Sequence, residues 1–115
     1  MTVSKEIQNL IDLFMENKTK VEYGTSEETD STYFIFSEIV IKQTVKSTGS
    51  RCSTHYLITS SKYDIDIKPG EFTEDEQNLL GCLFTRLHQY RTHTEKQKKL
   101  TNLSKAIKEI RNATT

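Results

Sequence analysis

The chain has no long apolar run. Its apolar stretches are only a few residues long, and Ile39-Val40-Ile41 is an example. A helix that crosses a bilayer needs about 20 consecutive apolar residues, so we expect no membrane span. The first six residues turn polar and charged where a signal peptide would need its apolar region. These two absences predict a cytoplasmic protein with no membrane partner.

Cysteine and glycine are also scarce. The two cysteines, Cys52 and Cys82, cannot build a disulfide scaffold, and we expect free thiols that are buried as small apolar side chains. The four glycines stand apart from one another, so the chain has no glycine-rich phosphate loop. It also lacks the Gly-x-Ser-x-Gly elbow of a serine hydrolase. We therefore predict no catalytic residue, no cofactor and no enzyme activity.

The histidines do not share a metal-binding pattern with the cysteines. Cys52 and His55 are three residues apart on a predicted strand, which places them on opposite faces. Cys82, His88 and His93 are six and five residues apart on a predicted helix, again on different faces. No zinc site is predicted.

Acidic residues alternate with apolar residues near Asp64, Asp66 and Lys68. On one strand these three side chains would project together, and the pattern is similar in form to the acid-x-Lys element of Mg²⁺-dependent nucleases. The simpler explanation is the solvent face of an amphipathic strand. A small Mg²⁺-dependent nuclease is therefore the third hypothesis for function.

The first half of the chain predicts one helix followed by strands. Apolar residues at helical spacing follow Ser4, a good N-cap, and predict a helix over 5–16. A short strand is expected at 21–23, and a polar acidic loop over 24–31. From residue 32 the period changes to two, which predicts one long strand to residue 45. The residues expected on one face of that strand are Tyr33, Ile35, Ile39, Ile41 and Val45.

Two further strands are predicted before the C-terminal helices. The segment 46–51 is typical of a hairpin loop, and a strand follows over 52–59. The next strand is expected to place Tyr63, Ile65 and Ile67 inward and to stop at Pro69-Gly70.

A capping box, Thr73-Glu74-Asp75-Glu76, predicts that a helix begins at about Glu74. Its apolar stripe is expected to pack on the sheet and comprises Leu79, Leu80, Leu83, Phe84, Leu87 and Tyr90. Thr92, His93 and Thr94 are poor helix formers, and a second capping box starts at Thr94, so we expect a kink or break there. Unbroken from 74 to 112, the helix would be about 58 Å long.

Beyond this expected break, four apolar residues repeat at 3-4-3 spacing, as in a short coiled-coil seam: Leu100, Leu103, Ile107 and Ile110. The last 35 residues are also strongly basic, with eight basic side chains against two acids, whereas residues 1–80 have eight basic against 14 acidic residues. The eight basic residues are Arg86, Arg91, Lys96, Lys98, Lys99, Lys105, Lys108 and Arg111. This charge division indicates binding, because basic side chains attract acidic proteins or nucleic acid.

The sequence thus predicts an α+β fold: a three- to four-stranded antiparallel sheet, an N-terminal helix and one or two C-terminal helices. We expect a single domain over 1–91, a basic docking or oligomerisation helix over 92–112 and a tail over 113–115. The predicted function is a small non-catalytic binding or regulatory protein, such as a phage or mobile-element inhibitor, that occupies a partner's surface.

Two alternatives for the partner stay open at this point. Self-association is expected to give a homo-oligomer, through the apolar seam or through an acidic loop (Glu27, Glu28, Asp30) that meets the basic helix of another copy. The second alternative is nucleic acid, bound by the basic C-terminal helix.

Overall fold

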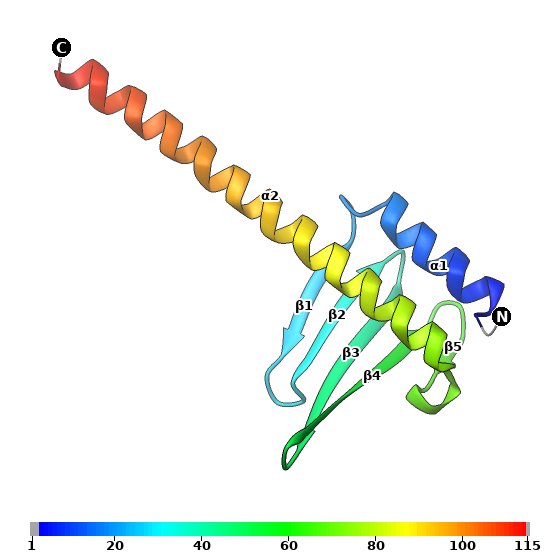
Figure 1. Ribbon diagram of the computed structural model, residues 1–115. Coiled ribbons are helices and arrows are strands. Elements are labelled where there is room, and N and C mark those ends of the chain that lie inside the picture. Colours follow the sequence, from blue (N-terminus) through cyan, green and yellow to red (C-terminus); the bar gives the residue numbers. More distant parts are fainter. Residues whose placement is uncertain (1–2, 115) are drawn as a thin grey trace. The chain divides into compact units, whose positions relative to one another are not determined.

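The computed structural model describes residues 3–114 and shows the predicted α+β fold (Figure 1). Met1 and Thr2, which contribute to the expectation about a signal peptide, lie outside the described residues. The elements in chain order are α1 (Lys5–Glu16), β1 (Glu22–Ser26), β2 (Ser31–Phe36), β3 (Ile39–Thr48), β4 (Arg51–Ser60), β5 (Ile65–Ile67), a 3₁₀ turn η1 (Pro69–Glu71) and α2 (Glu74–Thr114).

The chain divides into two units, Met1–Leu83 and Phe84–Thr115. This division falls inside α2, whereas the sequence placed a boundary after residue 91. Residues 113 and 114, expected in a tail, belong to the helix, and residue 115 lies outside the described residues. The docking or oligomerisation role of 92–112 stays a prediction.

The first unit contains a five-stranded sheet in which every strand pairs with its sequence neighbour. The order is β1-β2-β3-β4-β5, and all four pairings are antiparallel. The predicted count of three to four strands was therefore too low, although the class and the antiparallel arrangement are confirmed. The short strand expected at 21–23 extends over Glu22–Ser26, into the region predicted as loop.

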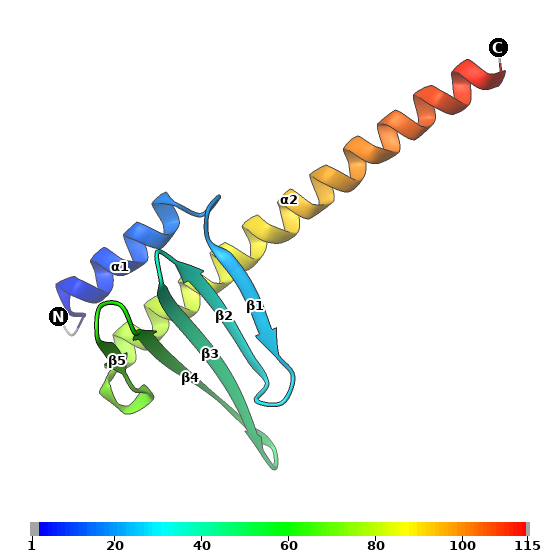
Figure 2. The same cartoon turned by 180° about the vertical axis from the view of Figure 1, so that it is seen from behind.

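One face of the sheet carries the core. The strand registers place a row of apolar side chains across all five strands: Tyr23, Phe34, Ile41, Ile58 and Ile67. Helix α1 packs on this face, because the rings of Phe14 and Phe36 meet edge to face with centroids 6.0 Å apart. Figure 2 shows the opposite face of the sheet, over which no helix of residues 3–83 lies.

Helix α1 has the predicted bounds, and its apolar stripe explains its position. Ile7, Ile11 and Phe14 recur at helical spacing and are buried. Ser4 is the N-cap residue, but its side chain makes no capping bond to the helix itself. Its hydrogen bonds go instead to α2.

The long strand expected over 32–45 is in fact two strands. Ser37 and Glu38 form a two-residue turn with positive φ angles of 50° and 66°, which join β2 to β3. Positive φ at both positions is typical of a type I′ turn, whose common sequence is Asn-Gly. Because Phe36 pairs with Ile39 across this turn, the two residues share a face. The predicted set of facing residues was therefore wrong: Phe34 and Ile41, not Tyr33 and Ile41, lie together.

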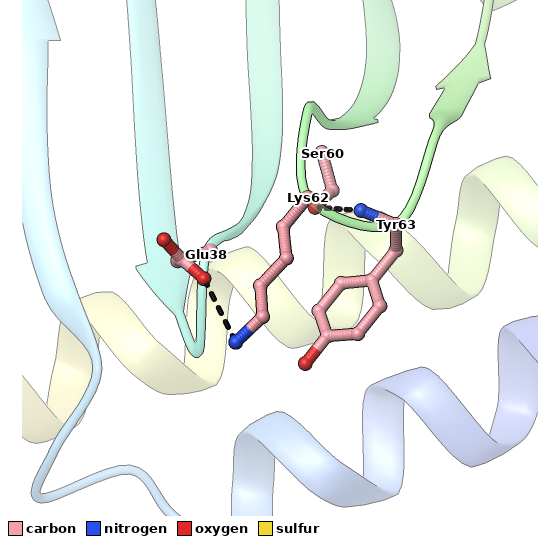
Figure 3. Close-up of polar contacts among 4 residues, drawn as sticks. All are labelled: Glu38, Ser60, Lys62 and Tyr63. Atoms are coloured by element: carbon pink, nitrogen blue, oxygen red, sulfur yellow. Dashed lines mark hydrogen bonds and ion pairs between the residues drawn. The ribbon is translucent and has the colours of Figure 1, made fainter.

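The turns at one end of the sheet are joined by an ion pair. The Nζ atom of Lys62, in the turn between β4 and β5, lies 3.2 Å from Oε2 of Glu38 (Figure 3). The backbone N–H of Tyr63 donates to Oγ of Ser60 over 3.3 Å. The ammonium group of Lys62 donates a hydrogen bond to the carboxylate of Glu38, and this bond raises the pKa of Lys62. Tyr63 is 50% exposed, so its predicted inward position was wrong.

Candidate interaction surface on the C-terminal helix

Helix α2 begins where the capping box predicts. The backbone N–H of Glu76 donates to Oγ1 of Thr73 over 3.1 Å, and the backbone N–H of Thr73 donates to Oε1 of Glu76 over 2.9 Å. Each side chain thus satisfies a backbone donor that the first turn of a helix leaves without a partner. The start of α2 at Glu74 is confirmed.

The carboxylate of Glu76 also holds the start of α1. Both the backbone N–H and the hydroxyl of Ser4 donate to its Oε2 atom, over 3.0 and 2.5 Å. Hydrogen bonds to a charged carboxylate favour the ionised form, and those from Ser4 and Thr73 lower the pKa of Glu76 to about 2.

Glu76 lines an open pocket of about 540 Å³, together with residues that include Ile7, Ile67 and Phe72. Glu76 is only 5% exposed, and its donors come from the chain itself. These bonds account for the buried carboxylate as a structural link between α1 and α2.

Helix α2 runs without interruption through the segment where a kink or break was expected. The hydroxyl of Thr94 donates to the carbonyl oxygen of Tyr90 one turn earlier, over 2.9 Å. This bond forms within the helix, so the side chain does not favour a non-helical backbone at this position. Arg91 and Glu95 form an ion pair at helical spacing, with an N–O distance of 3.1 Å. The second capping box at Thr94 is therefore not used, and the predicted break was wrong.

The four residues of the predicted seam lie on this helix in the second unit, and all are exposed. Leu100 is 45% exposed, Leu103 55%, Ile107 41% and Ile110 63%. Their 3-4-3 spacing places them on one stripe of the helix. A stripe of large apolar side chains in water favours association: full burial of an exposed side chain of this size contributes about 1.5–3 kcal/mol, and these half-exposed side chains gain about half of that each.

The eight predicted basic residues are not gathered on one face. At 3.6 residues per turn, Lys96 continues the apolar stripe, and Lys99 and Arg111 lie within about 60° of its centre on either side. Lys98 and Lys105 point to the far side of the helix, and Arg86, Arg91 and Lys108 occupy other positions around it. The acidic Glu95 and Glu109 are also on the flank or far side. The border of the seam is therefore basic.

The residues of the predicted acid-x-Lys element and of the possible metal sites do not form a cluster. The strand β5 covers only Ile65–Ile67, while Asp64 has a left-handed backbone with φ of 53° and Lys68 precedes the 3₁₀ turn. Asp64, Asp66 and Lys68 were expected at successive outward positions of one strand. They do not occupy such positions, because only Asp66 lies within β5. No three His, Cys, Asp or Glu side chains are placed to hold a metal ion within residues 3–114.

Both cysteines are free, as expected, but Cys52 and Cys82 are exposed, so their predicted burial was wrong. No helix in the described part of the chain is long and apolar enough to cross a membrane. No protein family, curated protein or solved structure matches this chain.

Proposed function

We propose that this chain is a non-catalytic protein that binds and covers an acidic, amphipathic helix of a partner protein. The exposed seam of α2 makes the contact, and the basic residues at its border guide the partner. An inhibitor of phage or mobile-element origin would act in this way. The observation that carries the proposal is the exposure of Leu100, Leu103, Ile107 and Ile110, between 41% and 63%, on one stripe of a continuous helix.

The charge around the seam favours an acidic partner over a second copy. Residues 92–112 contain six basic and two acidic side chains, a net charge of +4, so two copies of this segment repel each other. In a parallel pair, Lys96 would also lie opposite Lys96 of the other copy, because it continues the seam. A partner helix with acids beside its apolar stripe would instead form favourable pairs with Lys99 and Arg111.

The seam is also short, because its apolar residues cover barely two heptads. Self-pairing would have to draw its stability from four apolar side chains per copy while opposing the charge repulsion. An acidic partner gains from both the apolar burial and the charge attraction. The same reasoning predicts that salt weakens partner binding and strengthens self-association.

The test uses a synthetic helical peptide with leucines at seam positions and glutamates beside them. Fluorescence anisotropy measures its affinity for the full chain at low and high salt. We expect measurable binding that salt weakens, and a loss of more than tenfold on replacing Leu103 and Ile107 with Asp. The sheet should stay folded in this variant, because both side chains are already exposed.

Matched charge variants distinguish a partner that binds at the seam from one that is held by non-specific charge attraction. The change Lys96→Glu with Lys99→Glu alters the border of the seam, whereas Lys98→Glu with Lys105→Glu makes the same charge change on the far side. The first pair should weaken peptide binding by at least several-fold more than the second. Equal losses would contradict the proposal. A homo-oligomer that is already stable at low salt and that Leu103→Asp removes would also contradict it, because repulsion between the basic segments is then strongest; light scattering after size-exclusion chromatography detects such a species.

A further inference from the structure

The hairpin of β3 and β4 extends beyond the rest of the sheet. Strand β2 pairs with β3 only as far as Thr44, and β5 pairs with β4 only from Ile58 to Ser60. The pairs from Val45–Thr54 to Thr48–Arg51 therefore belong to a two-stranded ribbon with no neighbouring strand. We call residues 45–54 the hairpin arm; its green tip is visible in Figure 1, and residues 46–54 are all exposed.

The hairpin arm lies in a stretch of chain that contains no acidic residue. No Asp or Glu occurs between Glu38 and Asp64, whereas this stretch contains the cations Lys42, Lys46, Arg51 and Lys62. The first half of the chain is acidic overall, so its net charge does not show this local excess of positive charge. No acidic partner of Lys42, Lys46 or Arg51 is found within the described residues.

The strand register gathers these cations on one face. Thr44 pairs with His55, Lys46 with Ser53, and Thr48 with Arg51. Because paired residues share a face and alternate residues repeat it, Lys42, Lys46, Arg51 and His55 all lie on the face that α1 does not cover. The hydroxyls of Thr44, Thr48 and Ser53 lie between them, and Oγ of Ser53 is 3.2 Å from Nε2 of His55. Cations and hydroxyls together are the groups that contact nucleic-acid phosphates.

The dimensions of the hairpin arm fit a DNA groove. Four residues on each strand, at about 3.4 Å each, give a reach of roughly 14 Å. The major groove of B-DNA is about 12 Å wide and 8.5 Å deep and admits a two-stranded ribbon. The major groove of double-stranded RNA is too deep and narrow for such an element. We propose that the hairpin arm, together with Lys42 in the adjoining part of β3, binds double-stranded DNA, with Lys42, Lys46 and Arg51 contacting backbone phosphates.

Acidic residues lie near the base of the hairpin arm. The backbone N–H of Val45 donates to the carbonyl oxygen of Asp30, so the turn that carries Glu27, Glu28 and Asp30 is adjacent to that position. These acids repel phosphates, while Lys46 and Arg51 lie farther along the arm. Changing Glu27 and Glu28 to Gln should therefore raise the affinity for DNA by a fewfold, an effect that distinguishes this site from one on α2.

The test measures binding of the full chain to a 20-base-pair DNA duplex by fluorescence anisotropy between 50 and 200 mM salt. Each phosphate contact contributes about 0.9 to the slope of log affinity against log salt, so three contacts predict a loss of about 40-fold over this range. In the variant Lys46→Gln with Arg51→Gln, one remaining contact predicts a loss of only about three- to fourfold. Because both residues are exposed, the variant should unfold at the same temperature as the unmodified chain.

The matched control is Lys5→Gln with Lys20→Gln, which makes the same charge change at exposed positions outside the hairpin arm. It should leave the salt slope unchanged. An equal reduction of the slope by the control would overturn the proposal, as would a slope that only the α2 variant Lys98→Gln with Lys105→Gln reduces. Absence of duplex binding at 50 mM salt, or tighter binding to double-stranded RNA of the same sequence, would also overturn it.

Discussion

The link between Glu76 and Ser4 provides the most quantitative prediction for this fold. Replacing Glu76 with Gln keeps the size and one carbonyl oxygen but removes the negative charge. It also places an amide N–H₂ group where Oε2 accepts from the backbone N–H and the hydroxyl of Ser4. We expect the first unit to lose stability at neutral pH, because two part-buried donors of Ser4 lose their charged acceptor.

The magnitude follows from the pKa. The ordinary value of 4.5 for this carboxyl falls to about 2 in the folded chain, a difference equivalent to roughly 3 kcal/mol at 1.36 kcal/mol per pKa unit. Because Glu76 lines an open pocket, solvent screens part of this interaction. We therefore expect Glu76→Gln to lower the free energy of unfolding by about 1–3 kcal/mol at pH 7.

The pH dependence has a definite sign. The folded chain holds the proton of Glu76 less tightly than the unfolded chain, so the unfolded state binds more protons between pH 4.5 and about 2. The stabilisation is therefore complete above pH 4.5 and is lost as the pH falls toward 2. The stabilities of the unmodified chain and the variant should converge over this interval.

Urea unfolding followed by circular dichroism and tyrosine fluorescence, at pH 7, 5, 4 and 3, measures this difference. The matched control is Glu74→Gln, an exposed acid in the same first turn of α2, which should cost at most about 1 kcal/mol through the helix dipole. The reasoning is refuted if both variants lose the same stability, or if the Glu76→Gln difference stays constant from pH 7 to pH 3.

Three further predictions concern backbone positions. Adding a Cβ atom at Gly24 would place it 2.2 Å from the ring of Tyr33, so Gly24→Ala should cost about 1–2 kcal/mol in urea unfolding, and less in a Tyr33→Ala background. Ser37 has a positive φ of 50°, so Ser37→Asn should stabilise the β2–β3 turn by about 0.5 kcal/mol, measured as a higher melting temperature. Thr94→Pro should break α2 at a local cost of about 3 kcal/mol and reduce the helical circular dichroism signal, whereas Thr94→Ala should preserve it; an unchanged signal in the proline variant would contradict a continuous helix.

Local signals in the sequence predicted where both helices begin. The apolar spacing after Ser4 and the capping box at Thr73 each depend on contacts within a few residues, and both helix starts were confirmed. The link between Ser4 and Glu76 was not predicted. It joins residues 72 positions apart, and neither spacing nor composition records such a contact.

The errors have physical causes as well. The turn at Ser37 and Glu38 lacks the glycine that usually accompanies positive φ, so two strands were taken as one, and the facing of their side chains was reversed. The break expected near Thr94 followed from intrinsic helix propensity, which is a weak preference. The seam was predicted from its spacing alone. Which basic residues border it and which lie on the far side could not be predicted, because that assignment requires a continuous helix.

The sheet and the helix link also differ in how far apart their partners lie along the chain. Each strand pairs only with the strand before or after it, so the hairpins close through short segments. The Ser4–Glu76 bonds instead require the chain ends of the first unit to meet. Because closing a long loop is slow and costly in entropy, we expect the strand meander to form first and α1 to dock last. The bonds to Glu76 would then act on the unfolding rate more than on the folding rate, as late-forming contacts do.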